Sequence, residues 1–129
     1  LAAWVTSLNV SPYLVMLIIV MIYVLLGMVM DSMATVLITV PIFLPVATSL
    51  GFDPIWFGVV IVLVMCTGSI TPPIGFNVFI ASGISKEVSL VSIFRHSIPF
   101  ALAIIAVTVI AVFFPSLSLW LPEMIYGPA

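Results

Sequence analysis

Several polar residues that could bind an ion lie close together in one stretch, Thr67–Asn77. It holds three hydroxyl side chains, those of Thr67, Ser69 and Thr71, and ends with the amide of Asn77. Hydroxyl, amide and carbonyl oxygens are the ligands that hard cations prefer. Membrane transporters form such ion sites where a helix is interrupted inside the membrane. We therefore predict a sodium site in this stretch.

The same stretch contains residues that interrupt a helix. Pro72 and Pro73 are adjacent, and Gly68 and Gly75 flank them. Each proline lacks a backbone N–H, and each disfavours the helical conformation at the residue before it. The pattern predicts two half-helices within 55–85, joined by an unwound segment.

The interruption admits two interpretations. In the first, oxygens left without intrahelical partners bind sodium, with candidate ligands at Gly68, Ser69, Thr71, Ile74 and Asn77. In the second, the prolines only kink the helix, and water or a neighbouring helix satisfies the free backbone groups. Two prolines, two glycines and three hydroxyl residues within nine positions exceed what a kink requires, so we favour the ion site.

Asp31 is a second candidate, for binding an ion or substrate. A carboxylate inside a membrane costs roughly 2.5–3.5 kcal/mol on insertion scales and is a functional candidate by default. Alternatively, Asp31 or Ser32 caps a helix that begins near Met33, and both roles can coexist. Thr35 and Thr39 are four residues apart and share a helix face, where they either line a substrate cavity or bond helix backbones.

The composition identifies the class of protein. Of 129 residues, 65% are hydrophobic and 5% are charged, whereas a globular domain carries about 25% charged residues. We expect an all-α integral membrane protein and exclude a soluble enzyme domain. The net charge of −2 offers no basic stripe for nucleic acid. Cys66 is the single cysteine, and the sequence contains no catalytic or phosphate-binding motif. We therefore expect that the protein is not an enzyme and that it uses no cofactor besides a coupling ion.

The apolar segments suggest about four membrane passages, since each requires ~20 apolar residues. After an amphipathic lead at 1–12, two runs of 18 residues cover 13–30 and 33–50. They are either two crossings or the arms of a re-entrant hairpin with its tip at Gly27–Ser32, and the residues alone leave both open. The start at Leu1, without a charged leader, predicts a piece of a longer protein.

Turn-forming and charged residues predict where the helices around and after the interruption begin and end. Asp53 is predicted to cap the helix that Pro54 begins. Residues 86–97 contain Lys86 and Arg95, the only lysine and the only arginine, and are predicted to form a cytoplasmic interfacial segment. A final span is expected over 98–121.

Four motifs, in this order and spacing, resemble one known family. They are Gly27–Asp31 (GMVMD), Pro41–Pro45 (PIFLP), Gly51–Gly58 (GFDPIWFG) and Gly68–Asn77 (GSITPPIGFN). Together with the ending Phe114–Pro122, they resemble the C-terminal part of the large, DctM-like membrane subunit of the tripartite ATP-independent periplasmic (TRAP) transporters. The resemblance covers nearly the whole chain, without the family's N-terminal repeat.

The resemblance implies a function and partners. Such transporters take small organic acids, such as C4-dicarboxylates or sialic acids, across the bacterial inner membrane by using a sodium gradient. A periplasmic solute-binding protein delivers the substrate, and a small membrane subunit completes the complex. The large subunit is an elevator transporter with two inverted repeats, each containing a helical hairpin and a broken helix.

Carried over to this chain, the resemblance favours the hairpin over two crossings for 13–50. It identifies Gly27, Asp31, Ser32 and Thr35 with the hairpin tip or substrate site. It makes 55–85 the second broken helix, in which one sodium ion would bind backbone oxygens of Gly68, Thr71 and Ile74.

Two other functions remain open on the sequence. A divalent-anion/sodium symporter would have similar hairpins and would need no binding protein. A non-transporting membrane assembly subunit would have a plain kink at Pro72 and Pro73, with no ion.

Overall fold

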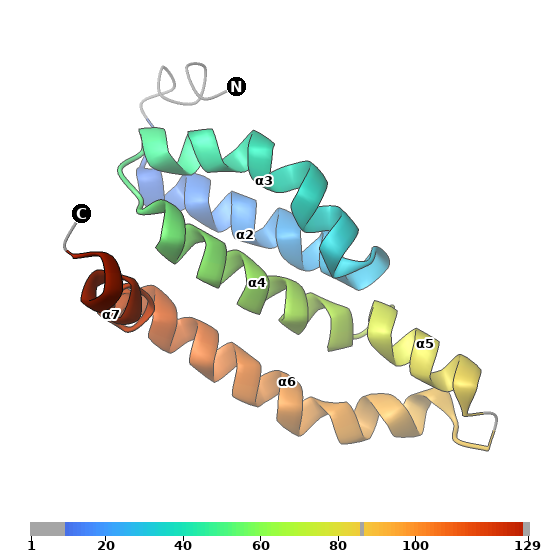
Figure 1. Ribbon diagram of the computed structural model, residues 1–129. Helices are drawn as coiled ribbons and strands as arrows, with labels where there is room; N and C mark the ends of the chain where they lie inside the picture. The colour runs from blue at the N-terminus through green and yellow to red at the C-terminus, as the bar shows by residue number, and fades with distance from the viewer. Residues whose placement is uncertain (1–9, 86, 128–129) are drawn as a thin grey trace.

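The computed structural model of this chain describes residues 10–85 and 87–127, so most of the predicted lead at 1–12, and Lys86, lie outside the described residues. Within these ranges every regular element is an α-helix (Figure 1). The helices are α2 (Pro12–Val29), α3 (Ser32–Ser49), α4 (Pro54–Ile70), α5 (Phe76–Ile84), α6 (Leu90–Phe113) and α7 (Pro115–Tyr126). The predicted all-α class is confirmed.

The helices have the length and surface of membrane helices. Three of them, α2, α3 and α6, are long and apolar enough to cross a bilayer, and α4 is a shorter apolar helix. Large apolar side chains point outward along them; Leu17 is 57% exposed and Leu37 is 69% exposed. Water would penalise such a surface, whereas lipid does not, which fits an integral membrane protein.

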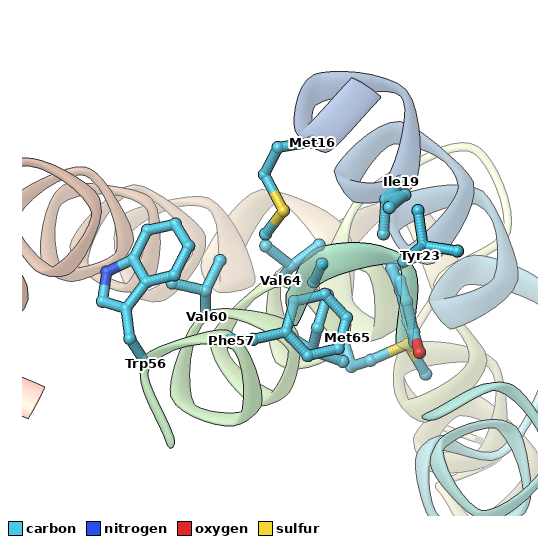
Figure 2. Packing of buried hydrophobic residues seen from close by; sticks show 11 residues of the cluster. Met16, Ile19, Tyr23, Trp56, Phe57, Val60, Val64 and Met65 are labelled. Atoms are coloured by element: carbon cyan, nitrogen blue, oxygen red, sulfur yellow. The ribbon is translucent and has the colours of Figure 1, made fainter. Parts of the chain in front are cut away.

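The hairpin of α2 and α3 packs on one side of α4, and α6 runs back along the other side (Figure 1). The core lies mainly between α2 and α4, where Tyr23 and Phe57 are fully buried. Figure 2 shows Tyr23 of α2 beside Met65 of α4. The antiparallel hairpin therefore agrees with the sequence, while its predicted re-entrant position in the membrane stays a prediction.

Local signals place the helix starts. Pro12 is the first residue of α2, and Asp31 caps α3 by accepting a hydrogen bond from the Ala34 N–H at 3.0 Å. Asp53 caps α4 as predicted, accepting from the N–H groups of Ile55 at 2.7 Å and Trp56 at 3.1 Å. These side-chain oxygens satisfy donors that the first turn of a helix leaves free.

The indole of Trp56 fixes α4 against α6. Its Nε1–H donates to the Ala111 carbonyl at 2.9 Å, and both residues are buried. This contact joins the start of α4 to the end of α6, so the two helices run antiparallel with a defined register.

The boundaries after the interruption differ from the prediction. One helix, α6, runs through Pro99, although a boundary was expected between 86–97 and 98–121. A single proline is tolerated because it removes one donor and neighbouring groups can replace it. The predicted final span is instead divided at Phe114, whose backbone is non-helical with φ −121° and ψ 75°, and α7 begins at Pro115. Residues before proline disfavour helix.

Candidate functional site

The interruption between α4 and α5 is present and shorter than predicted. Helix α4 continues to Ile70, so Thr67, Gly68 and Ser69 lie in its last turn rather than in the unwound segment. Only 71–75 is non-helical, because the first residue without an N–H is Pro72. The two prolines are joined by a cis peptide bond.

The backbone conformation of the break follows from its residue types. Thr71, which precedes proline, is extended with φ −92° and ψ 134°, as proline requires of its neighbour. Gly75 has φ +54° at the start of α5, a left-handed conformation that glycine adopts without strain. The residue types within Thr71–Gly75 are therefore sufficient to explain why the helix is interrupted there.

The prolines leave carbonyl oxygens at the end of α4 without their usual donors. The carbonyls of Gly68 and Ser69 would pair with residues 72 and 73 in a continuous helix, and both of these are prolines. Gly68 accepts instead from the Thr71 N–H at 3.2 Å. The Thr71 hydroxyl donates to the Thr67 carbonyl at 2.5 Å, which leaves its own oxygen lone pairs available.

Two predicted ion ligands bond to each other across the break. The Asn77 amide of α5 donates to the Ser69 hydroxyl of α4 at 3.1 Å, and this hydroxyl donates to the Cys66 carbonyl at 2.9 Å. Ser69 is only 2% exposed. The pair ties the two half-helices together, so these side chains have a positioning role whether or not they contact an ion.

The hairpin tip lies directly against the last turn of α4. A Cβ added to Gly68 would stand 2.5 Å from the Val24 carbonyl oxygen and 3.2 Å from the Gly27 Cα. A Cβ added to Gly27 would stand 2.9 Å from the Met65 carbonyl oxygen. Only glycine lets two helix backbones approach this closely. The structure thus brings together two motifs that are about forty residues apart.

The remaining predicted tip residues make local hydrogen bonds. Thr35 is 1% exposed and donates to the Asp31 carbonyl at 2.8 Å, and Thr39 donates to the Thr35 carbonyl at 2.6 Å. Asp31 is exposed and Ser32 half-buried at the start of α3. Of the alternatives left open, capping by Asp31 and backbone bonding by both threonines are observed.

Two contacts at the site escaped the sequence analysis. The Tyr23 and Thr39 hydroxyls lie 2.8 Å apart and join the hairpin arms; because Thr39 gives its one proton to Thr35, Tyr23 supplies the proton here. The ring of Phe94 on α6 lies against Gly75. A tyrosine one turn before Gly27 was a usable signal, whereas nothing in the sequence pairs Phe94 with Gly75.

One hollow in the described part of the chain lies away from the break. It has a volume of about 820 Å³ and is lined mainly by apolar side chains near the turn between α3 and α4, including Tyr13, Phe52 and Trp56. Because it does not include residues of the break or the hairpin tip, it adds nothing to the polar site.

Comparison with known proteins identifies a family that matches this chain. Residues 1–117 match the family described as the DctM component of the tripartite ATP-independent periplasmic transporters. The C4-dicarboxylate TRAP transporter large permease protein DctM of Pseudomonas aeruginosa is 36% identical over 123 residues, which cover 95% of this chain and 29% of that protein.

Relatives with other named substrates match the same region. The sialic acid TRAP transporter large permease of Vibrio cholerae is 30% identical over 127 residues, covering 98% of this chain and 30% of its own. The ectoine/5-hydroxyectoine permease of Ruegeria pomeroyi is 35% identical over 100 residues, covering 78% and 23%. The chain thus spans less than a third of these relatives. No solved structure matches it.

Proposed function

Because this chain belongs to the DctM family of tripartite ATP-independent periplasmic transporters, we propose that it forms about half of the transport core of a sodium-coupled uptake system for small organic acids. It is an integral protein of the bacterial inner membrane. The proposed partners are a small membrane subunit and a periplasmic solute-binding protein, as the word tripartite implies.

The observation that carries this proposal is the contact between the hairpin tip and the helix break. Gly27 of α2 and Gly68 of α4 meet with their bare backbones, so that a Cβ placed on either glycine would lie 3.2–3.4 Å from the Cα of the other. Ion binding at the break would therefore act on backbone that directly supports the hairpin tip. A structural anchor has no need for this combination of a broken helix and a close backbone contact.

The residues at the break fit a sodium ion. Gly68, Thr71 and Ile74 would supply backbone oxygens on either side of two prolines that have no N–H, and the Thr71 hydroxyl oxygen keeps free lone pairs. Sodium is a hard cation that accepts such neutral oxygen ligands. The Ser69–Asn77 hydrogen bond would hold the two half-helices at a fixed separation around the ion.

An organic anion would be favoured beside this ion. The N-terminal end of α5 lies at the break, and helix N-termini carry partial positive charge. Transporters direct such half-helix ends at substrate carboxylates. Sodium would thus contribute both charge and order to the site, which makes anion uptake depend on the sodium gradient.

The test is uptake by proteoliposomes that contain the full-length permease, the small subunit and the binding protein. A sodium gradient is imposed, and C4-dicarboxylates, sialic acid and ectoine are offered in turn. We expect sodium-dependent uptake of one of them. Thr71→Val should weaken the sodium dependence, because valine keeps the shape of threonine and removes its oxygen.

Thr108→Val is the matched control. Its hydroxyl donates to the Ile104 carbonyl at 2.7 Å, four residues back in α6, as Thr71 does to Thr67. If Thr71→Val and Thr108→Val change the sodium dependence of uptake equally, the proposed ion site is wrong. Uptake without the binding protein would favour the symporter alternative, and no uptake of any acid would favour an assembly subunit.

A further inference from the structure

An aromatic ring from α6 covers the break on one side. Phe94 Cε1 lies 2.9 Å, and its Cζ 3.2 Å, from the point where a Gly75 Cβ would stand. Gly75 is buried and Phe94 is half-buried. The ring therefore occupies the space that a side chain on residue 75 would fill, in contact with bare backbone.

The position that a Gly75 Cβ would occupy also lies close to a proposed sodium ligand. The Thr71 carbonyl oxygen is 3.3 Å from the Gly75 Cβ position, so this oxygen and the Phe94 ring edge are neighbours around Gly75. Phe94 is in the first turns of α6, one residue before Arg95. Phe94 lies in the segment that was predicted from its lysine and arginine to be on the cytoplasmic side.

A ring in this position affects how water reaches the oxygens of the break. The apolar shell around an ion site controls solvent access and the local dielectric. Electrostatic attraction between a cation and carbonyl dipoles weakens when water enters. Removal of the ring would open the break toward the α6 side without removing any oxygen ligand.

We propose that Phe94 is a positioning residue that closes the proposed sodium site at the break from the α6 side. This inference rests on the proposed function, because it assumes that sodium binds at the break. It adds a residue from outside the hairpin and the broken helix, whose role is to exclude water and not to ligate the ion.

The experiment measures equilibrium binding of radiolabelled sodium to the purified full-length permease, with no organic acid present. Phe94→Ala should weaken sodium binding about tenfold, the scale of outer-shell effects at ion sites. Phe94→Leu, which keeps an apolar side chain, should restore most of the affinity. Phe100→Ala is the matched control, since Phe100 lies on α6 and is 70% exposed.

The outcomes separate the inference from the function beneath it. If the unmodified permease binds sodium and Phe94→Ala binds it equally well, the inference is overturned while the proposed function stands. If the unmodified permease binds no sodium, both are overturned. If Phe94→Ala does not fold, Phe94→Ser and Phe94→Leu decide: the inference requires weaker binding in serine than in leucine, and equal binding in the two overturns it.

Discussion

Helix α3 contains two prolines in its interior, and the segment that joins α4 to α5 also contains two, yet only the second pair interrupts a helix. Pro41 and Pro45 lie inside a continuous helix, whereas Pro72 and Pro73 separate two helices. Each isolated proline removes one hydrogen bond and restricts one preceding residue. Adjacent prolines restrict two successive residues and remove two successive donors, which a helix cannot repair within one turn.

The two regions are also held in place differently. In α3, hydroxyl groups bond to the helix itself, and Thr39 is joined to Tyr23 of α2 at 2.8 Å. Next to the break, the last turn of α4 packs with bare backbone against α2, where Gly68 meets Gly27. Hydrogen bonds through side chains tolerate small shifts, whereas a contact between backbones does not. The break is thus the less adaptable of the two.

The largest effect is expected from removing the adjacent prolines. Proline costs about 3 kcal/mol in a helix interior, so Pro72→Ala with Pro73→Ala should let α4 extend toward Gly75. The new amides at 72 and 73 and the amide of Ile74 should be protected from hydrogen exchange in the double variant, and sodium-dependent uptake should fall. Pro41→Ala with Pro45→Ala is the matched control and should preserve uptake. Rapid exchange of the amides of residues 72–74 in the double variant would mean that Gly75 sets the break by itself.

A smaller effect, on the free energy of unfolding, is expected when a side chain is placed between the closely packed backbones of α2 and α4. Gly68→Ala places a methyl 2.5 Å from the Val24 carbonyl oxygen, and overpacking costs about 1–3 kcal/mol. Unfolding of the purified permease in detergent should show this loss. Gly58→Ala in the same helix meets nothing within 4 Å and should be neutral, or stabilising by up to about 1 kcal/mol. Equal stability of the two variants would contradict the close approach.

The hydrogen bond by which Asp31 caps α3 should contribute less to the free energy of unfolding than the close backbone contact does. Asp31→Ala removes the acceptor of the Ala34 N–H and should lower the free energy of unfolding by about 1 kcal/mol. Asp31→Asn should restore it, because asparagine is an equally good cap. Uptake measured in the same two variants separates capping from ligand contact. Loss of uptake in a fully stable Asp31→Asn would assign the carboxylate to the ion or substrate.

The smallest effect concerns the bond between the hairpin arms. A double-mutant cycle with Tyr23→Phe and Thr39→Val should give a coupling energy of about 0.6 kcal/mol, the average for hydrogen bonds between membrane helices. Tyr23→Phe keeps the ring that packs in the core, so the cycle isolates the hydroxyl. A coupling of zero would show that the arms are held by apolar packing alone.

Local sequence signals were sufficient for much of the fold. Composition identified the membrane class, and apolar runs placed α2 and α3 within one residue of their observed bounds. The caps at Asp31 and Asp53 and the break at Pro72–Pro73 depend on neighbours in the sequence, so they could be predicted. The continuous α6 could not, because helix propensity does not show whether packing tolerates Pro99.

What the sequence by itself determined is where this chain is helical, apolar or interrupted, since these properties depend on residues a few positions apart. Only the tertiary structure decided which of them meet. The contact of Gly27 with Gly68, the bond of Tyr23 to Thr39 and the ring of Phe94 on Gly75 join different helices. Such contacts depend on how helices cross, which no local pattern specifies.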